Sequence, residues 1–236
     1  MRLAYFYDFE TSDLPLFSEP SSDPRQPHIV QCAAVLVDMD TRKVLSSFDL
    51  VARPDGWETG EKALEIHGIT TEYATAIGVP EIAIVYMLAG FEKIADLRVG
   101  HVEHFDARIM RIALKRFLGD TVADDFKAGE AQCTAKLAKP LMNRTGRGTV
   151  SLHDAHQHFL GTAFEGAHTA LSDTLACMAV YWAIQDEIYP DVEGPIGVGK
   201  TSLATRTANT IKQYGGVSEV GKSPTPISED DGVGFL

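Results

Sequence analysis

Apolar residues in the N-terminal part of the chain occur in three runs that have the length and composition of β-strands. Ala4 to Phe9 is aromatic and apolar, and Ile29 to Val37 is almost wholly apolar, which is typical of buried strands. Val44 to Val51 alternates between apolar and polar residues, as a half-buried strand does. Neither connection between these runs has a helical pattern, so the sequence predicts an antiparallel meander.

The following residues combine short strand patterns with helical periodicity. Further strands are expected at Leu97–His101 and around Ala128–Cys133. Helical patterns cover Glu61–Ile66, Pro80–Asp96, Phe105–Leu118, Thr134–Met142, Leu152–Leu160 and Ala170–Ile188. Five strands with helices inserted late in the chain predict an α/β architecture, in which helices flank a mixed five-stranded sheet.

The pattern changes near residue 190, so we expect one domain over residues 1–190 and a tail over residues 191–236. The tail has one helical pattern, from Thr201 to Gln213, and is otherwise predicted to be flexible. It also contains Gly194–Thr201, which satisfies the phosphate-binding loop pattern GxxxxGKT. That loop needs a preceding core strand and a βαβ unit, whereas a helix exit precedes it here. A P-loop nucleotide-binding protein is therefore a remote alternative.

The chain is acidic, with a formal net charge of −12 at pH 7. This charge argues against broad nonspecific adhesion to nucleic acid, because such proteins are usually basic. It is compatible with an enzyme that holds only a few nucleotides through metal ions.

The cysteines and the apolar segments indicate the cellular compartment of the protein. Cys32, Cys133 and Cys177 form no CxxC pair, which indicates free thiols in a reducing cytoplasm rather than a disulfide framework or a zinc site. The uncharged apolar run Ile82–Phe91 is too short to span a bilayer. The first strand pattern begins at about the third residue and leaves no room for a signal peptide. We expect a cytoplasmic protein without a membrane partner, of cellular or phage origin.

The first strand ends with two acids, Asp8 and Glu10. Strand side chains two positions apart project from the same face, so these carboxylates are expected side by side. Neighbouring carboxylates repel each other, and a hard divalent cation relieves that repulsion. The alternative is a strand that ends at Asp8, with both acids in solvent.

Three further residues have the chemistry of a site. Asp106 lies where a short strand gives way to a helix, His168 lies at a helix entrance, and Asp173 lies about one turn inside that apolar helix. Taken singly, each has a structural alternative: a charge at a helix N-terminus, a helix cap and an exposed position.

Taken in order, these segments resemble the three exonuclease motifs of the DEDD nuclease family, and the resemblance covers residues 1–188. The histidine five residues before the last acid marks the DEDDh branch, which includes the proofreading exonuclease subunit of bacterial replicative DNA polymerase. Val102 is a departure, because many relatives of that subunit have asparagine there. The motifs read Asp8-x-Glu10-Thr11, His101-x-x-x-Phe105-Asp106 and His168-x-x-x-x-Asp173.

The resemblance implies a ribonuclease-H-like fold and a metal-dependent 3′–5′ exonuclease that releases nucleoside 5′-monophosphates. Two Mg²⁺ or Mn²⁺ ions would be held by Asp8, Glu10, Asp106 and Asp173. His168 would take the proton from the attacking water, as histidine side chains can near neutral pH.

The resemblance also implies contacts to the substrate. Thr11 and His67 match positions that contact the terminal nucleotide, and Leu14 matches an apolar wedge against the terminal base. The alternatives are a turn threonine, a surface histidine and a loop leucine. Glu65–Thr70 is similar to the stretch between motifs one and two of the proofreading type, which favours DNA over RNA.

The expected partner is therefore a nucleic-acid 3′ end, with single-stranded DNA favoured, and the alternative function is an exoribonuclease that trims RNA 3′ ends. The ending Glu229–Leu236 resembles the acidic, apolar-tipped tail of single-stranded-DNA-binding proteins. It suggests a replication or repair protein as a further partner through the tail.

Overall fold

The computed structural model describes residues 1–164 and 166–189. The predicted boundary at residue 190, the tail helix, the Gly194–Thr201 pattern and the tail's protein partner concern residues outside this described part. The strands are β1 Leu3–Thr11, β2 Ile29–Asp38, β3 Lys43–Arg53, β4 Val79–Pro80, β5 Leu97–Gly100 and β6 Ala131–Cys133. The helices are α1 Glu61–His67, α2 Thr71–Ile77, α3 Glu81–Ile94, α4 Glu103–Phe117, α5 Asp120–Ala128, α6 Thr134–Leu141, α7 Leu152–Leu160 and α8 Ala170–Ile188.

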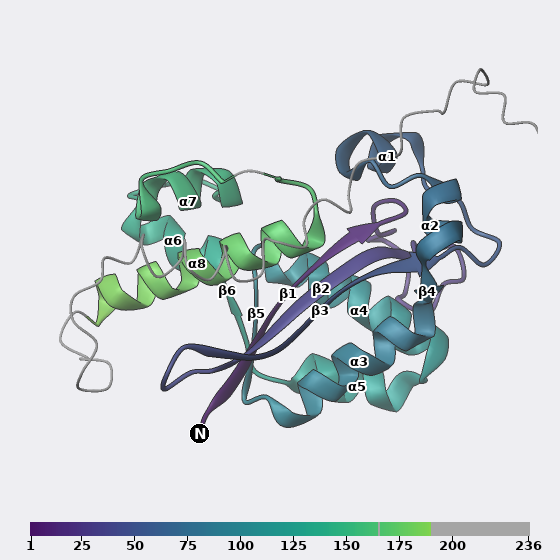
Figure 1. The fold of residues 1–236 in the computed structure, drawn as a ribbon, viewed down its shortest axis with the longest axis horizontal. Helices are drawn as coiled ribbons and strands as arrows, with labels where there is room; N and C mark the ends of the chain where they lie inside the picture. The colour runs from purple at the N-terminus through teal and green to yellow at the C-terminus, as the bar shows by residue number, and fades with distance from the viewer. Residues whose placement is uncertain (165, 190–236) are drawn as a thin grey trace, which may run out of the picture.

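The strands of the described residues form one mixed sheet in the order β4-β3-β2-β1-β5-β6. The predicted antiparallel meander of β1, β2 and β3 is confirmed, and β5 and β6 extend the sheet in parallel with β1. Helices α6, α7 and α8 lie on one side of the sheet, and α3, α4 and α5 lie on the other (Figure 1). The predicted α/β class, with a mixed sheet between helices, is confirmed.

The sheet differs from the expectation by one short strand. Val79 and Pro80 pair in parallel with Ala52 and Arg53 at the edge of the sheet, which gives six strands where five were predicted. The sequence pattern placed Pro80 at a helix start, and the helix does begin directly after it. Two residues are too short to show the alternation by which a strand is recognised.

Two short helices were not predicted. Helix α2 has seven residues and includes the β-branched Thr71, Thr75 and Ile77, and α5 has nine residues, of which three are aspartates, so neither has the composition of a clear helical pattern. The strand expected around Ala128 was placed too early, because Ala128 ends α5 and β6 begins at Ala131.

The alternation of β1 places its carboxylates. Tyr5, Tyr7 and Phe9 pack into the core on the side of α3 and α4, while Ala4 and Phe6 pack against α8. Asp8 and Glu10 continue the alternate positions of Ala4 and Phe6, so they project from the face of the sheet that α8 covers. The apolar residues of β1 thus form a rigid base for the acids at its end.

No helix within residues 1–164 and 166–189 combines the length and the apolar character needed to cross a lipid bilayer.

Two glycines give opposite predictions for stability. A Cβ at Gly78 would lie 2.3 Å from the carbonyl oxygen of Ala74 and 2.6 Å from the backbone nitrogen of Arg53. Gly78→Ala should therefore lower the free energy of unfolding by about 1–3 kcal/mol, since the backbone must shift. Urea denaturation measures this change.

Gly90 is the matched control. It lies inside α3, and apart from its chain neighbours and the backbone of its own helix, a Cβ there would meet no described atom within 4 Å. Gly90→Ala should raise the free energy of unfolding by about 0.5–1 kcal/mol, because alanine loses less conformational entropy in a helix. Equal effects of the two substitutions would contradict the packing described for Gly78.

Candidate active site

Three carboxylates meet at the end of β1. Asp8, Glu10 and Asp173 each offer an oxygen within 4.8 Å of the other two. The first two come from β1 and the third from the first turn of α8. The Oδ1 atom of Asp173 is buried and has no hydrogen-bond partner among the described residues. A buried, unpaired carboxylate oxygen beside two other carboxylates fits a divalent cation with hard oxygen ligands.

Asp106 adds a fourth acid beside this trio. It lies in the first turn of α4, is 2% exposed and accepts a hydrogen bond from the backbone N–H of Phe9. That N–H is available because the pairing of β1 with β5 ends at Phe6 and Val99, so β1 extends beyond its neighbour. The sheet topology therefore brings α4 to the same strand end as α8.

The crowding of acids changes their protonation. Burial and then the charges of Asp106, Asp173 and Glu10 raise the pKa of Asp8 well above its usual range. Burial and the charge of Asp173 raise the pKa of Glu10 to about 8. Burial raises the pKa of Asp173 to about 6, although a hydrogen bond from His168 opposes the rise. Protons neutralise part of the cluster without a cation, and metal binding would displace them.

His168 lies at the edge of the cluster. Its φ angle is +70°, its backbone N–H donates to Oδ2 of Asp173 at 3.2 Å, and the residue is exposed. The helix cap considered for His168 is instead provided by Thr169, whose hydroxyl accepts from the N–H of Ser172. The cap does not use the His168 imidazole, and the proximity of this histidine to Asp173 opposes the rise in the pKa of that carboxyl.

The three predicted substrate residues lie around the start of the β1–β2 loop. The hydroxyl of Thr11 donates to the carbonyl of Asp13 at 2.9 Å, and Leu14 is 67% exposed. His67 is buried rather than on the surface, and its ring lies against the backbone of Thr11. Its Nδ1 accepts from the N–H of Ile69, whereas Nε2 has no hydrogen-bond partner among the described residues.

A buried ion-pair network beneath the cluster was not predicted from the sequence. Arg98 on β5 donates to Glu103 at 2.9 Å and to Glu92 at 3.0 Å, and Tyr7 donates to Glu103 at 3.2 Å. Glu103 lies about one helical turn before Asp106, so the network holds the start of α4 against β1 and β5. The available signal was a single arginine inside the short apolar strand Leu97–Gly100.

Gln31 fixes the start of α8 in a similar way. It lies opposite Glu10 in the strand register, and its side-chain oxygen accepts from the N–H of Ala170 at 3.2 Å. Its amide nitrogen donates to Asp49 on β3 at 2.7 Å. One side chain therefore aligns the helix that carries Asp173 with the strand that carries Glu10. In the sequence, Gln31 stands out as a single amide residue within the apolar run of β2, and this was the available sign of a structural role.

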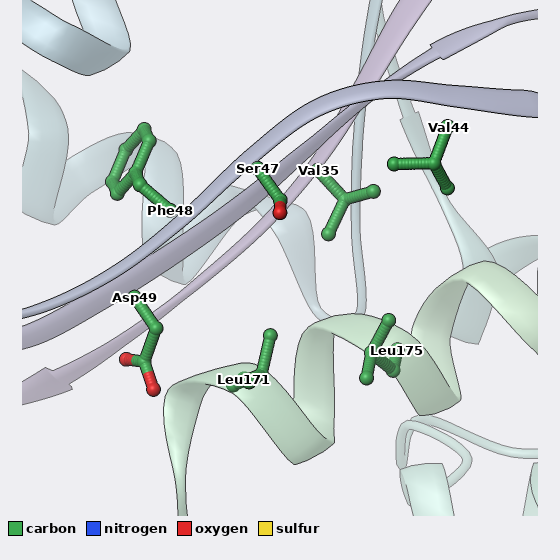
Figure 2. Close-up of a pocket in the computed structure, with 7 residues that line it drawn as sticks. All are labelled: Val35, Val44, Ser47, Phe48, Asp49, Leu171 and Leu175. Atoms are coloured by element: carbon green, nitrogen blue, oxygen red, sulfur yellow. The ribbon is translucent and has the colours of Figure 1, made fainter. Parts of the chain in front are cut away.

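A hollow of about 210 Å³ lies beside this contact, between the sheet and α8 (Figure 2). Its lining residues are Val35, Val44, Ser47, Phe48, Asp49, Leu171 and Leu175. Asp49 is the one carboxylate among them, and its hydrogen bond to Gln31 already engages it. The hollow lacks a set of metal ligands, so the acid cluster is the candidate active site.

Comparison with known proteins identifies the family of the chain. The family model RNase_T, described as an exonuclease, matches residues 5–181. No curated protein matches the chain in sequence.

Solved structures share the fold. E. coli exonuclease I in complex with a dT13 oligonucleotide is 19% identical with a TM-score of 0.64, over 80% of this chain and 42% of that one. The zinc-bound form of the E. coli exonuclease I complex with single-stranded DNA is 18% identical with a TM-score of 0.62, over 81% and 42%. The chain thus spans about two fifths of the length of these structures.

The repulsion within the cluster predicts that loss of one charge stabilises the metal-free protein. In EDTA, Asp8→Asn should raise the melting temperature by ~2–4 °C, the shift that roughly 1 kcal/mol gives in a domain of this size. Because the pKa of Asp8 is raised in the folded state, its charge destabilises the fold above the unfolded-state pKa. The gain should vanish near about pH 4, the unfolded-state pKa of an aspartate, and should grow as the pH rises above that value.

Differential scanning calorimetry with and without Mn²⁺ checks this prediction. The ion should raise the melting temperature of the native protein more than that of the variant, because the variant has lost a ligand. A lower melting temperature of Asp8→Asn in EDTA would count against crowding as the dominant force in the site.

Proposed function

Because this chain belongs to the RNase_T exonuclease family, we propose that it removes nucleotides from the 3′ end of single-stranded DNA by a metal-dependent mechanism. The observation that carries the proposal is the meeting of Asp8, Glu10 and Asp173 within 4.8 Å, with Asp106 beside them. The products are nucleoside 5′-monophosphates.

The donor set supports a hard divalent cation. All four side chains offer carboxylate oxygens, which suit Mg²⁺ or Mn²⁺ better than softer metals. We assign Asp8, Glu10, Asp106 and Asp173 as the ligands of two such ions. Ions held by these side chains would supply activation of a water molecule and stabilisation of the charge that develops on the phosphate.

His168 is proposed as the general base. It adjoins Asp173 at the solvent side of the cluster, where an attacking water can reach it. Its imidazole would accept the proton of that water as the water oxygen attacks the terminal phosphate. The bond between phosphorus and the 3′ oxygen of the preceding nucleotide would break, and that oxygen would take up a proton from solvent. Leu14, Thr11 and His67, which surround the start of the β1–β2 loop, are proposed to hold the terminal nucleotide.

Single-stranded DNA is the favoured substrate for two reasons. The segment Glu65–Thr70 resembles the proofreading type, and the structurally similar E. coli exonuclease I was solved with DNA oligonucleotides. An exoribonuclease would degrade the matching RNA strand faster than DNA.

A ladder assay on 5′-labelled DNA and RNA strands tests the proposal. Shortening from the 3′ end should require Mg²⁺ or Mn²⁺ and stop in EDTA. Asp8→Ala and Glu10→Ala should each lower the rate by about 10³-fold or more, because several kcal/mol of transition-state stabilisation is lost. Asp125→Asn, which removes an exposed acid on α5, should leave the rate unchanged. Activity that persists in EDTA would rule out the metal-dependent mechanism.

His168→Asn tests the general base. Asparagine tolerates a positive φ angle better than most residues, so the backbone at this position should be retained. The rate should fall about 10²–10⁴-fold, which is the usual contribution of general acid–base catalysis. His158→Asn, at an exposed position of α7, is the matched control. A rate within a few-fold of the native enzyme would remove His168 from the mechanism.

A further inference from the structure

The loop between β1 and β2 begins directly after Glu10 and Thr11, and its backbone is fixed by successive turns. The N–H of Glu19 donates to the carbonyl of Leu16 at 3.0 Å. Two further turns follow, from Asp23 to Pro20 and from Gln26 to Asp23, each at 3.1 Å. A loop with this many internal hydrogen bonds has little freedom to rearrange.

Gln26 forms the centre of this loop. It is 1% exposed, its amide nitrogen donates to the carbonyls of Leu16 and Pro20 at 3.0 Å, and its oxygen accepts from the N–H of Leu16 at 3.0 Å. A buried amide with both ends engaged fixes the groups around it.

Helix α4 anchors the loop at two points. Arg108 donates to the carbonyls of Leu16 and Glu19, and Arg116 donates to the carbonyls of Gln26 and Pro27. Arg108 is two residues beyond Asp106 on the same helix. The turn from Leu16 to Glu19 is therefore fixed beside the part of α4 that carries an acid of the site.

Phe17 is the second residue of that turn and is 65% exposed. Pro15 is buried, whereas Leu14, which precedes it in the chain, is 67% exposed. A mobile loop could turn such side chains toward the core. This backbone is held by Gln26 from within the loop and by Arg108 and Arg116 from α4. The loop thus presents the Phe17 ring to solvent from a backbone that is held against α4 and that follows Thr11 by only six residues.

The negative net charge of the protein favours a substrate contact that does not depend on charge. A net charge of −12 opposes the approach of a polyanion, so phosphate contacts alone are a weak source of affinity. Stacking of bases on aromatic rings does not depend on charge and tolerates every base, because each has a π-face.

Resting on the proposed function, we propose that Phe17 stacks on an unpaired base of the substrate strand, upstream of the terminal nucleotide. Leu14, three residues away, is the residue assigned to the terminal base. Three residues span at most about 10 Å, which is about three stacked base steps of 3.4 Å. Phe17 therefore meets a base within the first few nucleotides. Because stacking requires an exposed base, this contact selects single strands over duplexes.

Steady-state kinetics of Phe17→Ala tests the proposal with two substrates. One is a single-stranded oligothymidylate, and the other is the p-nitrophenyl ester of thymidine 5′-monophosphate, which has no upstream base. For the oligonucleotide, KM should rise about 5- to 150-fold, the factor that corresponds to the ~1–3 kcal/mol of one base–aromatic stack, with kcat nearly unchanged. Hydrolysis of the ester should not change.

Two further variants separate stacking from a structural effect. Phe17→Trp should retain the native KM, because it restores an aromatic surface. Tyr86→Ala, which removes a 58% exposed aromatic ring on α3, should leave both substrates unaffected. An unchanged oligonucleotide KM in Phe17→Ala, or equal losses on both substrates, would overturn the proposal.

A binding measurement keeps this inference distinct from the proposed function. Fluorescence anisotropy of a labelled oligothymidylate with Asp8→Asn protein reports affinity without cleavage, and adding Phe17→Ala should weaken it by the same factor. If the native protein binds the strand through Phe17 but does not shorten it, the proposed function fails and the stacking stands. If the native protein shortens the strand and the rate does not depend on Phe17, the proposed function stands and the stacking proposal fails.

Discussion

The mutual repulsion of the acids at the end of β1 is the constraint on which the rest of this structure depends. Asp8, Glu10 and Asp173 lie within 4.8 Å of one another, and Asp106 adjoins them. Such a group separates unless its backbones are held by other forces. Those forces come from the aromatic core under β1 and from the contacts that seat α4 and α8.

Two buried polar contacts provide that seating. The pairing of Arg98 with Glu103 holds the first turn of α4, and Gln31 holds the first turn of α8. Both act on helix starts, where a rotation of the helix would move its carboxylate away from the other acids. Buried polar networks that are fully paired restrict a core to one arrangement. The stability of the site therefore resides in neighbours that take no part in its chemistry.

The sequence predicted the meander and α8 because these elements are long apolar runs, whereas β4 has only two residues, and α2 and α5 are short and rich in β-branched or acidic residues. The motifs indicated which acids belong together, but not that Asp106 lies outside the closest trio. Gln31 and Arg98 stood out as polar residues in apolar strands, yet their partners could not be predicted. Gln31 meets Ala170, which is 139 residues away, and only the folded chain brings them together.

The order of the clustered acids along the chain has a consequence for synthesis. Asp8 belongs to the first strand, whereas Asp173 belongs to the last helix of the described residues. Because a chain leaves the ribosome from its N-terminus, the acid cluster is incomplete until α8 has emerged and docked on the sheet. A chain that still lacks α8 therefore cannot place Asp173 beside Asp8 and Glu10, and the acid cluster forms only when the sheet and this helix have come together.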